Sequence, residues 1–376
     1  MSEYQCYEFV AVDRPLTSKQ MAELRAISSR AEITPTRFWN EYHWGDLKAD
    51  PAKLVERYFD AHMYFANWGT HRLILRVPAK RVEVKALRAY FVGDAASARV
   101  VGEQVILDLH SEDEDREYDD EVGAALGELA PLRTELMLGD LRGAYLAWLL
   151  AVQEGEVSDK DREPPVPPGL PELTPAQEAM IEFLRLDRDL VTAAAAGSGA
   201  DGDDTPALRR WVSALSVRAK NEWLARAIEE PELALGAELR KMFRSETKAA
   251  DGGQGGRSVS QLRASAERVR DERERAEAEA RERKKKKAEA ARRKRLDALA
   301  AKGAAAWDEL EALVEKKEYD TASKLAVELR ELATREGTLA AFAERFKGLR
   351  KRQVRRRGFF DRWERRKNEP DDSHAD

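Results

Sequence analysis

The sequence is poor in cysteine and contains no long apolar segment. One cysteine, Cys6, occurs among 376 residues, which excludes an intramolecular disulfide and favours a reducing compartment. No stretch approaches the roughly 18 apolar residues that a membrane-spanning helix requires. The first ten residues, MSEYQCYEFV, lack the basic and then apolar pattern of a secretory signal peptide. These absences predict a cytoplasmic protein with Cys6 in its core.

Motifs that carry well-understood chemistry are also absent. The sequence contains no nucleophile elbow, no phosphate-binding P-loop and no cysteine pairs with zinc-site spacing. Gly197, Gly199 and Gly202 match the spacing of the dinucleotide-binding fingerprint, but an alanine-rich helical segment precedes them and aspartates accompany them. The fingerprint needs a preceding strand, and carboxylates repel a pyrophosphate. We interpret the glycines as an interhelical loop, expect no cofactor, and favour a non-enzymatic protein.

The histidines offer a weak alternative. Four of the five histidines, His43, His62, His71 and His110, lie in the N-terminal domain near acidic residues. A metal site needs three or four ligands that converge on one point, and no histidine pair has the spacing that would place both on one helix face. The acidic segment Ser111–Glu121 lacks the glycine and ligand register of a calcium loop. Scattered histidines and an exposed acidic loop are the simpler interpretation.

Charge is unevenly distributed along the chain. Charged residues make up 36% of the sequence and the net charge is −5. Residues 251–376 carry 34 Lys and Arg against 26 Asp and Glu, a net charge of +8 that leaves −13 for the first 250 residues. This asymmetry indicates either a basic region with an anionic partner or an electrostatic attraction between the two halves.

The N-terminal part alternates predicted strands with helices. Tyr7–Val12, Arg72–Val77 and Gln104–Leu109 are short segments rich in β-branched, aromatic or aliphatic residues, as in strands. Thr17 begins Thr-Ser-Lys-Gln, a capping box that predicts a helix N-terminus. Gly102, the first residue of a two-residue loop, favours a tight hairpin. The pattern predicts an α+β domain with a mostly antiparallel sheet, followed by all-α segments that include a long charged helix.

Composition marks the boundaries of the later segments. Four prolines occur between Pro164 and Pro168, which stiffens the chain either as a strap on a domain surface or as a free linker. Residues 263–295 are almost all Ala, Arg, Lys or Glu without an apolar stripe, which favours a solvated helix over a sustained coiled coil.

The predicted organisation is an α+β domain at 1–155, a Pro-rich linker or strap at 156–173, a small helical bundle at 174–246, a Gly-rich flexible linker at 247–262, a charged single helix at 263–295, a helical hairpin or three-helix unit at 296–350 and a basic tail at 351–376.

The basic clusters give the strongest functional signal. They occupy Lys284–Lys287, Arg292–Arg295 and Arg350–Arg357, and aromatic residues follow the last cluster. Lysine and arginine bind phosphates with release of counterions, and aromatic rings can stack on bases. Acidic residues nearly balance basic ones over 263–290, so we expect solvated charges there. The predicted nucleic-acid-binding residues are Arg350, Lys351, Arg352, Arg355, Arg356, Arg357 and, as a stacking group, Trp363.

An aromatic cluster in the N-terminal domain leaves two interpretations open. Most of its members are expected in the core, and the remainder would form an exposed surface or a small-molecule pocket. The cluster consists of Phe38, Trp39, Tyr42, Trp44, Tyr64, Phe65 and Trp68.

The segments YEFVAVDRPLT, EITPTRFWNEYHWGD, YFANWGTHRLILRVP and EPPVPPGL resemble those of a bacterial family of conserved, uncharacterised proteins. The resemblance covers about the first 190 residues. It implies a bacterial cytoplasmic protein with a folded N-terminal domain, and it implies no activity, cofactor or site residue.

The sequence therefore yields two functional hypotheses. The first is a non-enzymatic interaction or adaptor protein: the N-terminal domain holds a protein partner, the charged helix acts as a spacer, and the basic C-terminal end contacts nucleic acid or another anionic partner. The second is an enzyme or ligand-binding protein that uses the aromatic residues and His43, His62 and His71 of the N-terminal domain.

Overall fold

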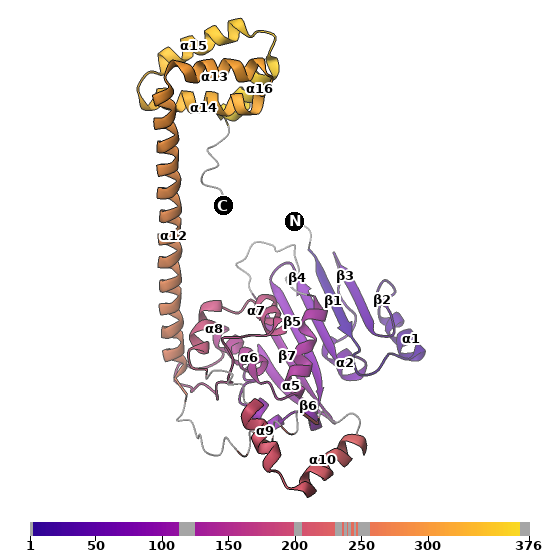
Figure 1. Cartoon of the computed structure of the whole chain (residues 1–376). Coiled ribbons are helices and arrows are strands. Elements are labelled where there is room, and N and C mark those ends of the chain that lie inside the picture. The colour runs from indigo at the N-terminus through magenta and orange to yellow at the C-terminus, as the bar shows by residue number, and fades with distance from the viewer. Residues whose placement is uncertain are drawn as a thin grey trace. The chain divides into compact units, whose positions relative to one another are not determined.

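Seven strands form one antiparallel sheet in the computed structural model of the chain (Figure 1). The structure describes residues 3–112, 125–198, 205–229 and 256–368, together with positions 235, 236, 239, 242, 243 and 246. The chain divides into unit 1, Met1–Asp271, and unit 2, Glu272–Asp376. The strand order is β2-β3-β1-β4-β5-β7-β6. The strands are β1 (Gln5–Val10), β2 (Glu32–Ile33), β3 (Arg37–Tyr42), β4 (Ala61–Ala66), β5 (Thr70–Pro78), β6 (Ala96–Val101) and β7 (Gln104–Glu112).

Alternation along the strands supplies a separate apolar core on each face of the sheet. Ile74 of β5 and Ile106 of β7 point to the face that also carries Phe9. That face packs against α1 (Ser18–Ile27) and α2 (Pro51–Arg57). Their chain neighbours Leu73 and Leu107 belong to the opposite core. Because side chains alternate with a period of two, each central strand contributes to both cores.

The second core joins the sheet to helices that follow it in the chain. The helices of unit 1 beyond α2 include η1 (Ala79–Arg81), α3 (Val84–Leu87), α4 (Leu126–Leu129), α5 (Pro131–Met137), α6 (Arg142–Gln153), α7 (Pro175–Phe183), α8 (Arg188–Ala195), α9 (Thr205–Ala214) and α10 (Val217–Glu229). Met180, Phe183 and Leu190 of α7 and α8 pack in the same core as Phe65 and Leu73 of the sheet. This core thus continues past the predicted linker at 156–173, because the apolar stripes of α7 and α8 are buried against the sheet.

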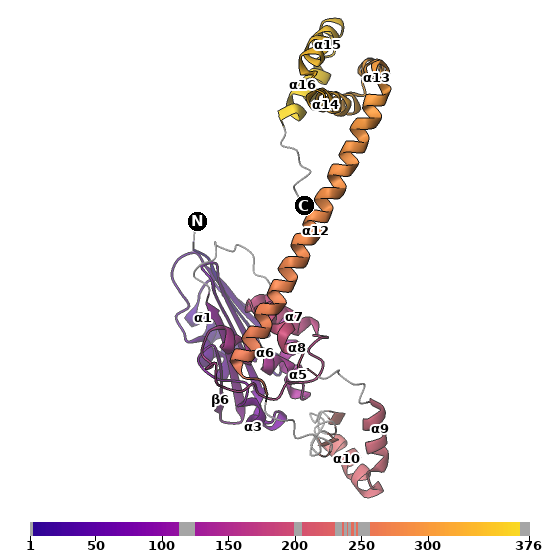
Figure 2. The same cartoon turned by 90° about the vertical axis from the view of Figure 1, so that its left-hand side faces the viewer.

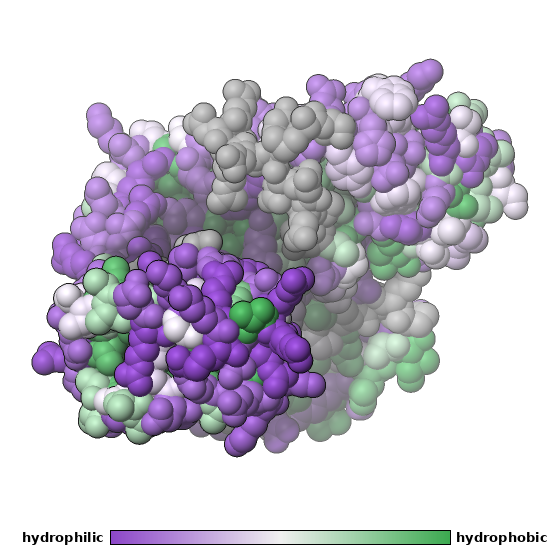
Figure 3. All heavy atoms as spheres, turned by 90° about the horizontal axis from the view of Figure 1, so that it is seen from above, coloured by the Kyte–Doolittle hydropathy of each residue, from purple (hydrophilic) through white to green (hydrophobic). Residues whose placement is uncertain are grey.

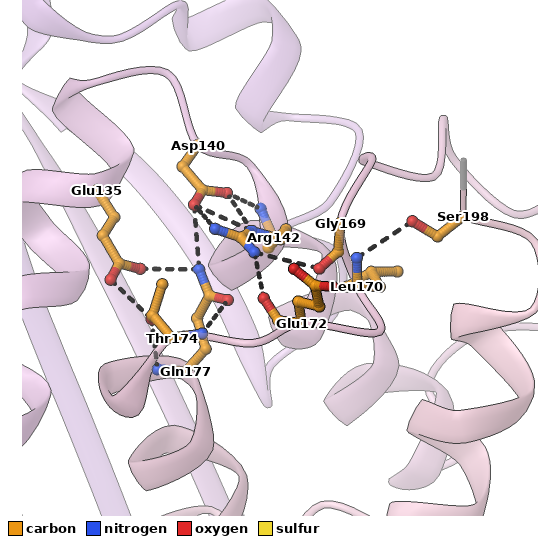
Figure 4. Close-up of polar contacts among 9 residues, drawn as sticks. All are labelled: Glu135, Asp140, Arg142, Gly169, Leu170, Glu172, Thr174, Gln177 and Ser198. Carbon is orange, nitrogen blue, oxygen red and sulfur yellow. Dashed lines mark hydrogen bonds and ion pairs between the residues drawn. The ribbon is translucent and has the colours of Figure 1, made fainter. Parts of the chain in front are cut away.

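The proline-rich segment lies on unit 1 as a strap. Tyr90 donates a hydrogen bond to the carbonyl of Pro165 at 2.7 Å, and the hydroxyl of Ser198 donates to the carbonyl of Pro167 at 2.7 Å. Arg142 donates to the carbonyls of Gly169 (3.1 Å) and Glu172 (2.7 Å) (Figure 4). Of the two interpretations left open by the sequence, the structure shows the strap.

The long charged helix α12 (Val259–Lys302) belongs to unit 1 by its first turns and to unit 2 by the remainder. Val259, Leu262 and Ala266 are buried in the core of unit 1. The helix therefore begins four residues before the predicted Arg263, because these apolar side chains anchor its first turns. Residues 247–255 of the predicted glycine-rich linker lie outside the described residues, whereas 256–262 are ordered on unit 1.

Unit 2 is built around the end of α12 and four further helices, which Figure 2 shows in a second view. They are α13 (Ala304–Glu315), α14 (Tyr319–Arg335), α15 (Leu339–Arg352) and α16 (Arg357–Asn368). Leu296, Leu310, Leu329 and Phe346 share one core with Phe359 of α16. Most of the predicted basic tail is thus a packed helix, because its aromatic residues complete this core; residues 369–376 lie outside the described part. No helix among the described residues is long and apolar enough to cross a membrane.

Candidate anion-binding surface of the C-terminal unit

The predicted basic residues lie at the end of α15 and in the turn that leads to α16. Arg350, Lys351 and Arg352 occupy the last helical turn of α15, where cations interact favourably with the negative end of the helix dipole. Arg355 and Arg356 lie in the turn, and Arg357 begins α16. All six basic residues therefore lie within one short stretch of unit 2, formed by the end of α15, the turn and the start of α16.

Some of these side chains have structural partners. Arg352 forms an ion pair with Glu311 of α13, and Arg356 donates to the carbonyl of Glu315 at 3.3 Å. The guanidinium carbon of Arg350 lies 5.3 Å from the ring centroid of Phe360, a cation–π contact. These three residues help to hold α15 and the turn against α13 and α16.

The other three cations are available. Lys351, Arg355 and Arg357 are exposed and form no ion pair with any side chain in the described part of the chain. No acidic residue occurs between Lys347 and Arg357. An anion that approached this surface would therefore meet charges that are not already neutralised by neighbouring carboxylates.

Trp363 does not belong to this surface. Its side chain is 4% exposed and lies in the core of unit 2. Its ring centroid is 4.7 Å from that of Phe346 and 6.0 Å from that of Phe342. A buried indole offers no face to a nucleic-acid base, so the expected stacking role is replaced by a packing role.

A second basic surface surrounds the part of α12 that belongs to unit 2. Every residue from Asp271 to Arg295 is exposed, and the stretch Lys284–Arg295 contains eight basic residues and one acidic residue. One side of this stretch faces a groove of about 450 Å³ between α12 and α14. Its lining contains cations, among them Lys285, Arg295 and Lys324, and also the carboxylates of Glu289, Glu328 and Glu331. The clusters are visible in the sequence. Over 263–290 as a whole, however, basic and acidic residues nearly balance, and this hides the fact that the excess of basic residues begins after Arg283.

One face of unit 2 is largely polar. Figure 3 shows one face of this unit in its foreground, and hydrophilic residues cover most of it, with only scattered apolar ones between them. This face therefore shows no large apolar patch of the kind that marks a hydrophobic docking interface.

The structure separates the three histidines of the alternative site. His43 is exposed, whereas His62 and His71 are buried on different sides of the sheet, in contact with Phe9 and Phe183 respectively. The described residues contain no group of three His, Cys, Asp or Glu side chains that could hold a metal ion. His43, His62 and His71 therefore do not form a common metal site in this structure.

Each buried histidine has a packing environment of its own. Nδ1 of His62 lies 2.9 Å from the carbonyl oxygen of Glu8, and the ring stacks on Phe9 with centroids 4.0 Å apart. Burial lowers the pKa of His62 to about 3, so the ring is neutral at pH 7. His71 contacts the carbonyl of Phe183 through Nδ1, while Arg185 donates to Nε2 at 2.8 Å.

The predicted core position of Cys6 is confirmed, because its side chain is buried. Burial raises the pKa of the Cys6 thiol to about 11. The thiol is therefore protonated and unreactive at neutral pH.

Unit 1 has a polar network that the sequence does not reveal. Gln177 is fully buried and donates to Glu135 (2.8 Å) and to Asp140 (3.2 Å), and Thr174 also donates to Glu135 (Figure 4). Burial alone would raise the pKa of Asp140, but hydrogen bonds from Arg142 lower it. The network fixes the start of α7 against the turn between α5 and α6. Because its members come from distant segments, only the capping box at Thr174 has a signal in the sequence.

Beside this network lies a hollow of about 530 Å³ between α4, α5 and α7. Its walls include Glu128, Glu135, Glu178 and Glu182, and its lining contains none of the predicted histidines or clustered aromatics. Of the aromatic cluster, Phe38 and Phe65 are fully buried, whereas Trp44 is 76% exposed. The hollow therefore does not coincide with the residues of the ligand-binding hypothesis.

Comparisons with known proteins add no relative from which a function could be transferred: no protein-family model matches the chain, and neither curated proteins nor solved structures show a significant match.

Proposed function

We propose that the protein is a non-catalytic adaptor whose C-terminal unit binds a nucleic acid through its basic surface. The observation that supports this proposal is the set of exposed cations Lys351, Arg355 and Arg357, which have no acidic partner in the described structure. Arg350 lies beside them and keeps its charge exposed while it rests on Phe360. The N-terminal unit holds a protein partner in this proposal.

Physical chemistry favours a phosphate backbone as the anion. Each lysine or arginine that meets a phosphate releases condensed counterions, so a group of unpaired cations gains affinity from a polyanion that it does not gain from an isolated carboxylate. Solvent-exposed ion pairs between side chains contribute only about 0–1 kcal/mol each. A run of seven cations without an acid between Lys347 and Arg357 therefore suits a polymer of phosphates better than an acidic protein surface.

The competing hypothesis lacks a comparable observation. An enzyme or ligand site in the N-terminal unit would need its candidate residues to converge. His62 and His71 are instead buried on different sides of the sheet, and His43 is exposed. The adaptor is therefore the better supported of the two functions.

The test is a binding comparison with a charge-matched control. In the test variant Arg350, Lys351, Arg355 and Arg357 are replaced by Glu; Arg352 is kept because it pairs with Glu311. In the control variant the exposed residues Arg30, Lys48, Lys53 and Lys85 of unit 1 are replaced by Glu. Fluorescence anisotropy with a labelled 20-base-pair DNA duplex and with single-stranded DNA should show at least about tenfold weaker binding for the test variant than for the control. Equal affinities would contradict the proposal.

A further inference from the structure

The segment Lys284–Arg295 of α12 has an unusual distribution of charge, and one of its sides faces the groove shared with α14. It lies in unit 2, all its residues are exposed, and it reads Lys-Lys-Lys-Lys, then Ala-Glu-Ala-Ala, then Arg-Arg-Lys-Arg. Successive residues of an α-helix are about 100° apart, so four consecutive cations surround the helix instead of lining one face. The segment is thus two rings of positive charge with a narrow, alanine-rich section between them.

The spacing of the two rings follows from helix geometry. Their centres are eight residues apart in the sequence, which corresponds to about 12 Å along the axis at about 1.5 Å per residue. Ala288, Ala290 and Ala291 make the section between the rings narrow except on the side of Glu289, which lines the groove shared with α14. The sides of this segment that face away from α14 can enter the groove of a partner while cations of both rings reach its walls.

Intramolecular pairing leaves much of this charge unneutralised. Lys286 lies 3.5 Å from Glu282, Arg293 lies 4.0 Å from Asp297, and Arg292 forms an ion pair with Glu331 of α14. Lys285, Lys287, Lys294 and Arg295 form no ion pair with described side chains. Like charges on neighbouring turns destabilise a helix, and an external polyanion would relieve that repulsion.

The aromatic residues of unit 2 argue against a single-stranded partner. Proteins that bind single strands use exposed aromatic rings as stacking platforms. The guanidinium carbon of Arg345 lies 4.8 Å from the ring centroid of Trp307, and that of Arg362 lies 5.7 Å from the ring centroid of Tyr319. The remaining aromatic residues in the described part of unit 2 are at most 9% exposed; they are Phe342, Phe346, Phe359, Phe360 and Trp363. The described part of unit 2 therefore presents no fully exposed aromatic ring, which favours phosphates over bases as the groups that it contacts.

We infer that Lys284–Arg295 binds duplex DNA of B form, with the helix in the major groove and its two rings on the flanking phosphates. The inference rests on the proposed function and names its partner. The major groove of B-DNA is about 12 Å wide and admits an α-helix, whereas the major groove of A-form RNA is deep and too narrow for side chains to read. Because the section between the rings is mostly alanine, recognition is largely independent of sequence.

The experiment uses the full-length chain and three labelled probes of equal length: a 20-base-pair DNA duplex, the corresponding RNA duplex and one DNA strand. In the α12 variant Lys285, Lys287, Lys294 and Arg295 are replaced by Gln, which keeps helix propensity high. In the control variant the exposed residues Lys48, Lys53, Lys316 and Lys317 are replaced by Gln. Circular dichroism spectra of all forms should coincide, which shows that α12 stays helical.

Two results are expected. The wild type and the control should bind duplex DNA at least about tenfold more tightly than they bind the RNA duplex or the single DNA strand. The α12 variant should bind duplex DNA at least about tenfold more weakly than the wild type does. Equal or tighter binding of the single strand or of the RNA duplex would overturn the inference. The α12 variant could also bind duplex DNA as tightly as the wild type while binding is weakened by replacing Arg350, Lys351, Arg355 and Arg357 with Glu. That outcome would overturn the inference and leave the proposed function standing. Absence of binding to all three probes would overturn both.

Discussion

Arg257 and Glu163 form a two-point ion pair that fastens the start of the long helix to the proline-rich strap. Nε and Nη2 of Arg257 donate to the two carboxylate oxygens of Glu163 at 2.9 and 2.8 Å, and the Glu163 side chain is 1% exposed. The hydroxyl of Tyr145 on α6 donates to the same carboxylate. A buried carboxylate with these donors is satisfied, but it depends on each of them.

Replacement of Arg257 by Met should destabilise unit 1 by about 3 kcal/mol or more, because it leaves a buried carboxylate without its counter-charge. Urea unfolding followed by tryptophan fluorescence measures this change in the free energy of unfolding. The matched control is Arg188→Met, which removes an exposed arginine that pairs with Glu178 and Glu182 and should cost less than about 1 kcal/mol. Equal effects in the two variants would show that the Arg257–Glu163 pair has no special role.

Local patterns in the sequence predict much of the secondary structure but less of the packing. Thr17 and Thr174 form the expected capping boxes, and Gly102 has a positive φ of 58° in the two-residue hairpin loop. Such features depend on neighbours in the chain. Which elements share a core depends on residues far apart, so the sequence pattern alone groups α7 and α8 in a separate bundle although they pack on the sheet.

The candidate site shows the same division. The basic residues of α15 can be found from composition, because charge density needs no tertiary information. The role of Trp363 cannot be found in this way. Aromatic residues within a basic segment are consistent with a stacking platform and also with a core stripe; here they are Phe359, Phe360 and Trp363. Their spacing of three and four residues matches one helix face, and burial in the core of unit 2 decides between the two roles.

Replacement of Trp363 by Ala should destabilise unit 2 by about 3–5 kcal/mol, because it removes a large buried ring from the core. Thermal unfolding of the full chain measures this effect. Under conditions where the variant stays folded, its affinity for duplex DNA should match that of the wild type. A much weaker affinity in a fully folded variant would instead support a direct contact between Trp363 and nucleic acid.

The buried His62 makes unit 1 sensitive to acid. Its pKa in the folded chain is about 3, below the value of about 6.5 for an unfolded chain. Between these two values the unfolded state binds a proton that the folded state does not, so stability falls as pH falls, by up to about 1.4 kcal/mol per pH unit. His62→Phe keeps the stacking on Phe9 and should remove this contribution to the slope between about pH 4 and pH 6.

Urea unfolding at several pH values measures this slope. The control is His43→Gln, which changes an exposed histidine and should leave the slope as in the wild type. Identical slopes for the wild type and the His62 variant would show that the ring titrates freely in the folded protein.

The measurement that tests the central claim most directly is the salt dependence of binding to a 20-base-pair DNA duplex, from about 50 to 300 mM salt. If the unpaired cations of α12 and α15 bind phosphates, the logarithm of the association constant should fall linearly with the logarithm of salt concentration, with a slope of about −4 or steeper. Replacement of Lys285, Lys287, Lys294 and Arg295 by Gln should reduce the steepness of this slope by about 0.9 for each phosphate that the variant no longer neutralises. An affinity that does not change with salt, or no binding at about 50 mM salt, would contradict the account.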